Sequence, residues 1–393
     1  MTIYEESIEY HEELGGKLEI ALKAPLKTTH DLSLAYTPGV AGVCEEIHKN
    51  PERVHDLTLK KNTVAIVSDG SAVLGLGNIG AEAAIPVMEG KAILFKEYAN
   101  VDAFPICLTT QNTIEIINIV KNLAPVFGGI NLEDIAAPRC FEIEEALLDI
   151  GIPVFHDDQH GTAIVTLAAI LNAAKLAGKN PTTLKVVING AGAAGIAIAE
   201  LLLSMSYDDA KPESVREIIL CDSKGIVSET RPDVVENASK LRIAKRTNRN
   251  NQNGSLADAI VDADVFVGVS VANCVTKDMV RSMADKAIIL AMSNPIPEIM
   301  PEDAKEAGAF IVGTGRSDFA NQVNNVLAFP GIFRGAIDAR APRITKKMKI
   351  AAARALATAV ENPTVDHILP AVLDKKVPYL VAEEVKRVHL EES

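Results

Sequence analysis

The run from Lys185 to Gly195, KVVINGAGAAG, restricts the possible folds of this chain more than any other segment. It reads as a β-branched strand, then the pattern G-x-G-x-x-G, then the small apolar helix pattern AGIAIAELLLSM. A strand, a glycine turn and a helix in this order leave free backbone amides at the helix N-terminus, where a pyrophosphate binds. We therefore predict a dinucleotide site at Gly190, Gly192, Ala193, Ala194 and Gly195.

The remainder of the chain alternates short apolar runs with helical patterns, which predicts an α/β fold with a doubly wound parallel sheet. The expected strands are residues 63–68, 92–95, 103–108, 125–127 and 152–155, and then 185–189, 217–222, 265–270, 287–295 and 309–315. A long helix is expected at 163–177, and the chain is expected to be helical from about 335 to its end, with breaks at Pro363, Pro370 and Pro378. The expected parts are an N-terminal α/β substrate and metal domain at 1–160, a Rossmann dinucleotide-binding domain at 161–335, and C-terminal helices at 336–393 that pack back on the first domain.

Charge and cysteine content exclude several classes of partner. With 52 acidic against 39 basic residues, the surface lacks the positive field that nucleic acid binding requires. The five cysteines are widely spaced and include no CxxC pair, which indicates reduced thiols and a cytoplasmic protein. The acidic N-terminus does not resemble a signal peptide, and no run of about 18 apolar residues is found, so no membrane association is expected.

Asp222 ends the strand pattern that follows the glycine motif. Its carboxylate can accept hydrogen bonds from the adenosine ribose and repel a 2′-phosphate, which favours NAD. Lys224 and Arg231 lie just beyond and can reverse that preference, so NADP stays open.

A second G-x-G-x-x-G match occurs at Gly75, Gly77 and Gly80. No clean strand–turn–helix pattern accompanies it, since the following helix soon carries Glu82 and Pro86. We interpret it as a tight turn in the substrate domain.

Four carboxylates fall in two short segments, Glu133 and Asp134 in INLEDIAAP and Asp157 and Asp158 in FHDDQHGTA. No nearby cation is evident that would neutralise them all, and all-oxygen ligands suit Mg²⁺ or Mn²⁺. The simpler alternative is a helix cap at Asp134 and a solvated acidic turn at 157–158. His156 and His160 lack a third nitrogen or sulfur ligand, so packing or support of the acidic pair is expected of them.

Two residues are candidates for proton transfer. Lys91 stands directly before the expected strand at 92–95, where partial desolvation would lower its pKa toward that of a general base. Tyr36 lies in the turn LAYTPGVA, which would hold a phenol proton donor at a fixed angle. The simpler alternatives to these roles are that Lys91 buries only its aliphatic stem and that Tyr36 is a core residue.

Asn294, Asn324 and Asn325 occur at strand or turn edges, where amides can hold a carboxylate or a nicotinamide group. As isolated residues they are more often caps or turn formers.

These segments together resemble the malic enzymes: LAYTPGVA, VSDGSAVLGLGNIG, FGGINLEDIAAPRCFEIE, FHDDQHGTA, GAGAAG, AMSNP and NNVLAFPG occur in this order in that family. The resemblance spans roughly residues 15–385 and is closest to the short bacterial or archaeal form. It implies divalent-metal-dependent oxidation and decarboxylation of malate to pyruvate and CO₂ with reduction of NAD or NADP. It also implies a homodimer or a larger homo-oligomer.

The resemblance assigns roles to individual residues. Glu133, Asp134 and Asp158 would bind the metal, Lys91 would be the base and Tyr36 the acid. Asn294, Asn324 and Asn325 would contact substrate and nicotinamide. One departure is that the long-form enzymes carry a malate-binding arginine after the DGS turn, where this chain has Ala72.

Two other functions stay open at this level. A lyase-type relative would release lactate or only decarboxylate oxaloacetate, and a nucleotide-sensing scaffold would keep the Rossmann unit with an inactive site. The first thirty or so residues contain no complete core and are expected to pack on another subunit, either by simple association or by delivering Tyr36 to the neighbour's site.

Overall fold

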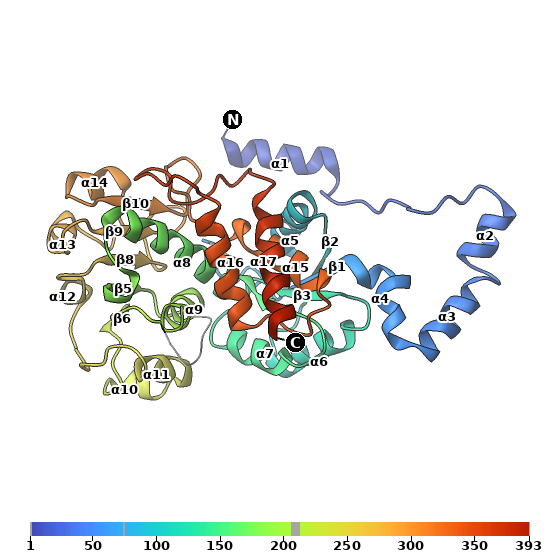
Figure 1. Ribbon diagram of the computed structural model, residues 1–393, viewed down its shortest axis with the longest axis horizontal. Coiled ribbons are helices and arrows are strands. Elements are labelled where there is room, and N and C mark those ends of the chain that lie inside the picture. The colour runs from blue at the N-terminus through green and yellow to red at the C-terminus, as the bar shows by residue number, and fades with distance from the viewer. Residues whose placement is uncertain (1, 74, 206–212, 393) are drawn as a thin grey trace.

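The computed structural model describes residues 2–73, 75–205 and 213–392 as two α/β units, a C-terminal group of helices and an N-terminal arm (Figure 1). The first sheet is parallel, with strand order β2-β1-β3-β4. The second has the order β10-β9-β8-β5-β6-β7 and is parallel apart from the short strand β7. The predicted α/β class with a doubly wound parallel sheet is confirmed.

The arm precedes the first strand and consists of α1 (Ile3–Leu14), α2 (Thr29–Ala35), α3 (Val40–Lys49), η1 (Pro51–Arg53), α4 (Val54–Leu57) and η2 (Leu59–Asn62), the two η segments being 3-10 turns. The first sheet contains β1 (Thr63–Ser68), β2 (Asp102–Cys107), β3 (Gly129–Leu132) and β4 (Val154–His156). Its helices are α5 (Gly80–Ala99), α6 (Thr113–Leu123) and α7 (Arg139–Leu147).

Strand β1 is buried along its whole length because helices cover both faces of its sheet. Val64 and Ile66 point to one face and pack in the core that includes Phe95 of α5. Ala65 and Val67 point to the other face and pack with residues of α6 and α7. The sheet is thus held between α5 on one side and α6 with α7 on the other.

Helix α8 (Asp157–Ala177) and the 3-10 turn η3 (Pro181–Thr183) lead into the second unit. Its strands are β5 (Lys185–Asn189), β6 (Glu217–Asp222), β7 (Gly225–Ile226), β8 (Val265–Gly268), β9 (Ile288–Ala291) and β10 (Ile311–Thr314). Its helices are α9 (Ala193–Leu202), α10 (Pro232–Val235), α11 (Ala238–Ala244), α12 (Leu256–Ile260), α13 (Lys277–Arg281) and α14 (Pro301–Glu306).

The C-terminal elements are η4 (Asn325–Leu327), α15 (Phe329–Asp338), α16 (Lys346–Thr358) and α17 (Val377–Glu392). Phe329 of α15 packs on Phe95 of α5 with ring centroids 4.7 Å apart, so this group lies against the first unit. Gly331 and Gly335 let α15 and α17 approach closely, since an added Cβ would lie 2.4 Å and 2.5 Å from backbone oxygens of α17. Figure 1 shows these helices beside α5, between the two sheets.

The prediction of a strand at 92–95 is wrong, because these residues lie inside α5. The buried side chains Met88, Ala92, Phe95 and Ala99 recur every three or four residues, which is the period of a helix and not of a strand.

The other differences concern boundaries. Residues 125–127 are not a strand, and β3 begins only at Gly129. Helix α8 begins at Asp157, six residues before the predicted start at 163, so the acidic pair forms its first turn. Residues 359–376 separate α16 from α17 and are not helical, so the predicted breaks at Pro363 and Pro370 are confirmed, whereas Pro378 lies in the first turn of α17 and does not break it.

Helix α8 is the one described helix long and apolar enough, by length and composition alone, to cross a bilayer. In this structure 72% of its apolar window is buried, and its middle packs in the largest hydrophobic core. Its apolar character is explained by this central position.

Candidate active site

Three carboxylates meet where the first sheet changes direction. Chain order reverses between β1 and β3, and in open α/β sheets ligand sites form at such switch points, beyond the carboxyl ends of the strands. Glu133 and Asp134 follow β3, and Asp158 lies in the first turn of α8 directly after β4. One carboxylate oxygen from each of the three lies within 4.8 Å of the others. The structure therefore brings the three predicted metal ligands together.

Burial and mutual repulsion disfavour the charged state of this cluster. Burial, with the neighbouring carboxylates, raises the pKa of Asp134 to about 9 and that of Asp158 to about 6. Burial also raises the pKa of Glu133 to about 7, although Lys91 acts in the opposite direction. A buried all-oxygen donor set of this kind fits a divalent cation, which would remove the repulsion.

Lys91 lies inside α5 and points at the acidic residues. Its Nζ is 2.5 Å from Asp157 Oδ2 and 2.9 Å from Glu133 Oε1, and the side chain is only 8% exposed. Desolvation alone would lower the pKa of Lys91, but the charges of Asp157, Glu133 and Asp158 outweigh it and raise the pKa above its ordinary value. The predicted lowering of this pKa is therefore wrong in this structure, and Lys91 neutralises part of the cluster.

Asp157 lies outside the three-carboxylate cluster and shares Lys91 with Glu133. Its Oδ2 accepts hydrogen bonds from Lys91 and, at 2.5 Å, from Asn325 Nδ2. A side chain at Gly161 would place a Cβ 1.8 Å from Asp157 Oδ1, so the glycine of HDDQHG is required for this packing. Asp157 thus orients Lys91 and Asn325. The sequence analysis had grouped Asp157 with the three metal-binding candidates and had not predicted this different role.

Glu144 of α7 contacts the two histidines that flank Asp157 and Asp158. Its carboxylate accepts from the backbone N–H of His156 at 3.0 Å and contacts His160 Nε2 at 2.8 Å. Burial alone would raise its pKa, but His160, Lys349 and His156 together hold the pKa at about 2. The expectation that the two histidines serve packing or support agrees with this geometry.

The DGS turn at Asp69–Ser71 binds the guanidinium of Arg139 from α7, a contact that was not predicted. Arg139 Nη2 donates to Asp69 Oδ2 at 2.7 Å and to Ser71 Oγ at 2.9 Å. The next residue, Ala72, donates its N–H to the carbonyl of the cluster residue Asp134 at 2.9 Å. Arg139 is therefore bound to the same turn that lacks the family arginine and that contacts Asp134 through Ala72, and its side chain is 29% exposed.

The motif that follows β5 has the geometry of a dinucleotide turn. Gly190 has a φ of +124°. A Cβ added at this residue would lie 2.5 Å from the carbonyl oxygen of Val269, which follows β8. A Cβ at Gly195 would lie 1.7 Å from the carbonyl oxygen of Gly190, whereas Gly192 has open space before it. Because chain order reverses between β5 and β8, this open space at the N-terminus of α9 lies at the second switch point.

The first glycine motif is a turn. Gly75, Gly77 and Gly80 all have φ values between +75° and +81°, and Val73 exchanges backbone hydrogen bonds with Gly77. Gly75 lies close to Asn294 and Pro295 of the second unit, so this turn adjoins the boundary between the units.

Asp222 ends β6, as predicted, but its carboxylate is not free. Arg231 Nη2 lies 2.5 Å and Lys240 Nζ 2.6 Å from Asp222 Oδ2. Although burial acts in the opposite direction, these contacts lower the pKa of Asp222 to about 2. Lys240, far along the chain, could not be connected to this position from the sequence.

The remaining asparagines follow β9 of the second unit or lie at the start of η4 in the C-terminal group. Asn294 precedes the cis bond to Pro295, and its Nδ2 is 3.5 Å from the carbonyl oxygen of Met292. Asn324 caps η4, its Oδ1 accepting from the N–H of Val326 at 3.0 Å. Asn325 is joined to Asp157, whereas Asn324 is occupied as a turn former.

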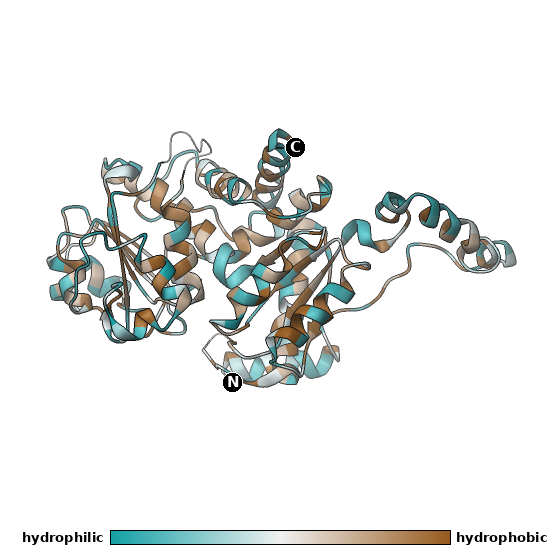
Figure 2. Cartoon of the chain, turned by 90° about the horizontal axis from the view of Figure 1, so that it is seen from below, coloured by the Kyte–Doolittle hydropathy of each residue, from teal (hydrophilic) through white to brown (hydrophobic). Residues whose placement is uncertain are grey.

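Tyr36 is the predicted residue that the chain does not bring to this site. It caps α2 on the arm and is 68% exposed, so the alternative of a core residue is wrong. Figures 1 and 2 both show α2 and α3 standing away from the two sheets and from α5, which carries Lys91.

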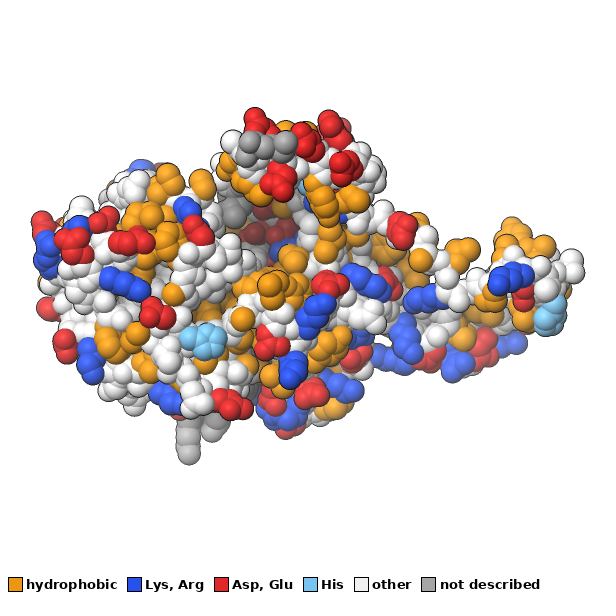
Figure 3. Space-filling model, turned by 90° about the horizontal axis from the view of Figure 1, so that it is seen from above, with side chains coloured by type: hydrophobic (Ala, Val, Ile, Leu, Met, Phe, Trp, Pro, Cys, Tyr) orange, Lys and Arg blue, Asp and Glu red, His pale blue; other side chains and the backbone are white. Residues whose placement is uncertain are grey.

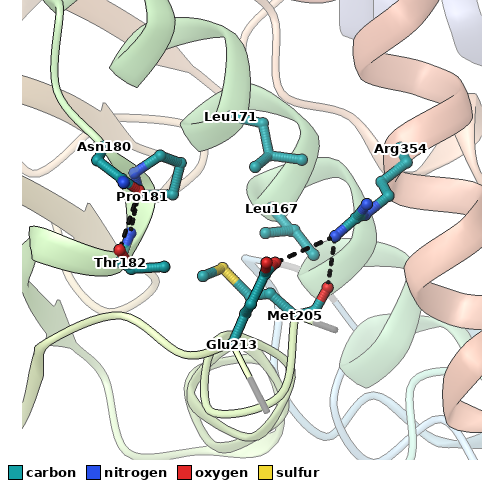
Figure 4. A pocket seen from close by; sticks show the side chains of 8 residues that line it. All are labelled: Leu167, Leu171, Asn180, Pro181, Thr182, Met205, Glu213 and Arg354. Atoms are coloured by element: carbon teal, nitrogen blue, oxygen red, sulfur yellow. Dashed lines mark hydrogen bonds and ion pairs between the residues drawn. The ribbon is translucent and has the colours of Figure 1, made fainter. Parts of the chain in front are cut away.

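A cavity of about 170 Å³ lies between α8, α16 and the segment after α9 (Figure 4). It is lined by Leu167, Leu171, Asn180, Pro181, Thr182, Met205, Glu213 and Arg354. None of the predicted site residues lines it, so it is separate from the carboxylate cluster.

Fold and site together define a two-unit α/β protein with a dinucleotide turn in one unit and a carboxylate cluster with a buried lysine in the other. The family model of the malic enzyme N-terminal domain matches residues 15–117, and that of the malic enzyme NAD-binding domain matches residues 159–389. The chain belongs to the malic enzyme family.

Individual relatives are similar over nearly the full length. A bifunctional malic/malolactic enzyme of Bacillus subtilis is 57% identical, over 100% of this chain and 94% of that protein. An NAD-dependent malic enzyme of Geobacillus stearothermophilus is 54% identical, over 95% of this chain and 76% of that protein. The crystal structure of an NAD-dependent malic enzyme from Thermotoga maritima superposes with a TM-score of 0.91 at 50% identity, covering 96% and 98% of the two chains.

Proposed function

We infer that this chain catalyses the divalent-metal-dependent oxidative decarboxylation of malate to pyruvate and CO₂ with reduction of NAD or NADP. The observation that carries the inference is the pairing of a buried lysine with a three-carboxylate cluster in a family member that also keeps an open dinucleotide turn. A plain 2-hydroxy-acid dehydrogenase would need no such cluster. A nucleotide-sensing scaffold would need neither the cluster nor the lysine.

The protein residues supply proton transfer and orientation. Lys91, held by Asp157 and Glu133, would accept the proton of the malate hydroxyl after passing its own proton to this acidic network. Tyr36 would donate a proton to C3 of the enol formed when CO₂ leaves. Asn325 and Asn294 would hold substrate or nicotinamide amide and carboxylate groups.

Glu133, Asp134 and Asp158 would hold Mg²⁺ or Mn²⁺, which acts as a Lewis acid toward the substrate oxygens when bound. The residues from Gly190 to Gly195 would hold the pyrophosphate of the dinucleotide, which accepts the hydride. Asp222 with its two cations would adjoin the adenosine ribose. The carboxylate of Asp222 supports NAD as the preferred cofactor, and the adjacent Arg231 and Lys240 keep NADP as the second candidate.

Arg139 is our candidate for the cation that binds the malate carboxylate in place of the family arginine missing at Ala72. It is fixed on the same turn by Asp69 and Ser71 through Nη2 alone. Both printed hydrogen bonds of the guanidinium use Nη2, the buried Nε has no hydrogen-bond partner among the described residues, and the side chain is 29% exposed, so donor capacity remains for an anion.

A malolactic reaction is the second candidate, because the relative that is 57% identical carries both activities in its name. We also propose that the enzyme is a cytoplasmic homodimer or larger homo-oligomer that acts without nucleic acid or membrane.

One assay tests the main proposal. Malate is supplied with NAD or NADP, with and without Mn²⁺, and reduced nicotinamide, pyruvate and lactate are measured. Metal-dependent production of pyruvate and reduced nicotinamide in equal amounts supports the malic enzyme reaction. Lactate without net nicotinamide reduction would replace it by the malolactic reaction, and no turnover of malate or oxaloacetate would refute both.

A further inference from the structure

Glu298 is a buried carboxylate of the second unit that the chemistry proposed above does not use. It lies in the loop between β9 and α14 and is 0% exposed. Within the described part of the chain it forms no ion pair, and burial raises its pKa. A carboxylate in such a position costs free energy unless hydrogen bonds replace its water. An apolar side chain would fill the same space without this cost, so what the carboxylate adds to packing is two hydrogen-bond acceptors.

Each of the two acceptor oxygens holds a different loop. Oε1 of Glu298 accepts from the N–H of Ser270 at 2.9 Å, and Oε2 accepts from the N–H of Ser293 at 3.1 Å. Ser270 follows β8 and Ser293 follows β9. The two strands are parallel neighbours in which Gly268 lies opposite Ala291. One side chain therefore ties together the carboxyl ends of two adjacent strands.

The fold makes room for this contact and strengthens it. Gly268 ends β8, and a Cβ at this residue would lie 2.3 Å from Glu298 Cδ, so a side chain there is incompatible with the buried carboxylate. The backbone adds two links between the same loops. Asn273 donates its N–H to the Pro297 carbonyl, and Val275 donates its N–H to the Glu298 carbonyl, each at 3.0 Å. The loop after β8 and the loop after β9 are thus held together at several points.

These two loops lie on one side of the dinucleotide turn. Strand order places β8 and β9 on one side of β5 and places β6 on the other. Val269, which follows β8, donates to the carbonyl of Asn189 at 2.9 Å, and Asn189 Nδ2 donates to Ser270 Oγ at 2.7 Å. The proposed sites put the pyrophosphate on the glycine turn after β5 and the adenosine ribose beside Asp222 at the end of β6. The nicotinamide half of the dinucleotide then falls at the ends of β8 and β9.

The loop after β9 also adjoins the first unit. A Cβ at Gly75 would lie 3.8 Å from the carbonyl oxygen of Asn294, the residue after Ser293. Figure 3 shows a hollow between the second unit, on the left, and the first, with acidic side chains in it. Hydride transfer requires the nicotinamide ring to contact the substrate carbon, and the carboxylate cluster and Lys91 lie on the first unit. The position of this loop therefore decides how the nicotinamide meets the substrate.

We propose that Glu298 is a positioning residue for the nicotinamide half of the dinucleotide. By holding Ser270 and Ser293 together, it fixes the two loops, and Asn294 with them, in the geometry that receives the nicotinamide. This inference rests on the proposed dinucleotide-dependent function. It requires a selective effect, because both hydrogen bonds of the carboxylate go to the loops after β8 and β9, whereas Asp222 lies on the other side of β5.

Two ligands that differ only by the nicotinamide test the proposal. NADH and ADP-ribose are titrated into wild type and Glu298→Gln, or NADPH and 2′-phospho-ADP-ribose if that pair binds wild type more tightly. Glutamine has the shape of glutamate but provides one acceptor and one donor group, so one of the two N–H groups loses its partner. The affinity for the reduced dinucleotide should fall about tenfold or more, and that for the ADP-ribose compound should change less than about twofold.

Unchanged affinity for both ligands, an equal fall for both, or a larger fall for the ADP-ribose compound would overturn the proposal. An equal fall would show general damage to the second unit. Glu306→Gln, on an exposed carboxylate of α14 that pairs with Lys277, is the matched control and should bind both ligands like wild type. Glu298→Asp replaces Glu298→Gln if the latter does not fold, since its shorter side chain cannot keep both contacts. Failure of the proposed function appears separately, as wild-type protein that binds neither NADH nor NADPH.

Discussion

Lys91 Nζ lies 2.5 Å from Asp157 Oδ2, in a contact that joins the middle of α5 to the first residue of α8 across 66 positions of sequence. The same ammonium lies 2.9 Å from Glu133 Oε1 and 4.1 Å from the centroid of the Phe329 ring. The lysine is therefore held in one orientation by two carboxylates and an aromatic face. This position between the cluster and the C-terminal helices suits a group that must meet its substrate in a fixed geometry.

Replacing Lys91 by alanine should lower kcat for malate oxidation by about a hundredfold or more, since it removes a positioned acid–base group. Tyr36→Phe should chiefly impair protonation of the enol. Oxaloacetate decarboxylation and tritium exchange into pyruvate, measured for both variants, separate the two steps. Lys96→Ala on the same helix and Tyr10→Phe on the arm serve as controls. Equal loss of every partial reaction in both variants would contradict the division of roles.

Asp158→Asn and Glu133→Gln should each weaken Mn²⁺ binding at least about tenfold, because each removes a charged ligand while nearly preserving shape. Titration calorimetry with Mn²⁺ in the absence of substrate measures this directly. Dinucleotide binding should be unchanged. Asp149→Asn, an exposed carboxylate that pairs with Arg343, is the control. Wild-type Mn²⁺ affinity in either cluster variant would remove the metal assignment.

Arg139→Gln should raise KM for malate by about tenfold or more, the cost expected on losing a charge-assisted hydrogen bond. KM for the dinucleotide should change less than about twofold. Arg343→Gln, on an exposed arginine, controls for charge alone. The opposite pattern, with only the dinucleotide KM raised, would assign Arg139 to the pyrophosphate.

Asp222→Ser should shift cofactor preference toward NADP. It removes the anion that would face a 2′-phosphate and leaves Arg231 and Lys240 without that partner. The ratio of kcat/KM for NADP to that for NAD should rise at least about tenfold, or about 1.4 kcal/mol. Asp233→Ser, which also removes a partner of Arg231, is the control. An unchanged ratio in the Asp222 variant would show that another group controls the choice.

Glu144→Gln should destabilise the fold at neutral pH by roughly 1–3 kcal/mol, because it weakens the buried hydrogen bonds of this carboxylate to the His156 N–H and to His160, and its pKa is lowered to about 2. A lowered folded-state pKa gives stability that is present above pH 4.5 and is lost as pH falls toward 2. Urea midpoints at pH 7 and pH 3 should therefore differ more for wild type than for the variant. Glu145→Gln, exposed on the same helix, should behave like wild type. Identical pH dependence in both variants would refute this account.

Much of the fold was contained in local sequence patterns. The strand, glycine turn and helix at 185–202 fold as predicted, because β-branched residues, glycine and small apolar residues each favour those local conformations. Asp158 also follows a strand, as the apolar run before it indicated, whereas Glu133 and Asp134 follow β3 and not a strand at the predicted residues 125–127. Residues 92–95 failed as a strand because a four-residue apolar run does not distinguish a strand from a turn of a buried helix, and only packing on Phe329 and Phe333 decides it.

The sequence by itself determined the α/β class and the chemistry of the individual candidates, because side-chain type and local periodicity are properties of short segments. Only the tertiary structure decided which charges meet. Asp157 pairs with Lys91 and leaves three carboxylates to the cluster, Arg139 takes its place on the DGS turn, and Lys240 reaches Asp222. These contacts join residues 18 to 70 positions apart, and electrostatic energies depend on distances of a few ångströms that sequence spacing does not define. For the same reason the exposure of Tyr36 became visible only once the rest of the chain had folded without covering it.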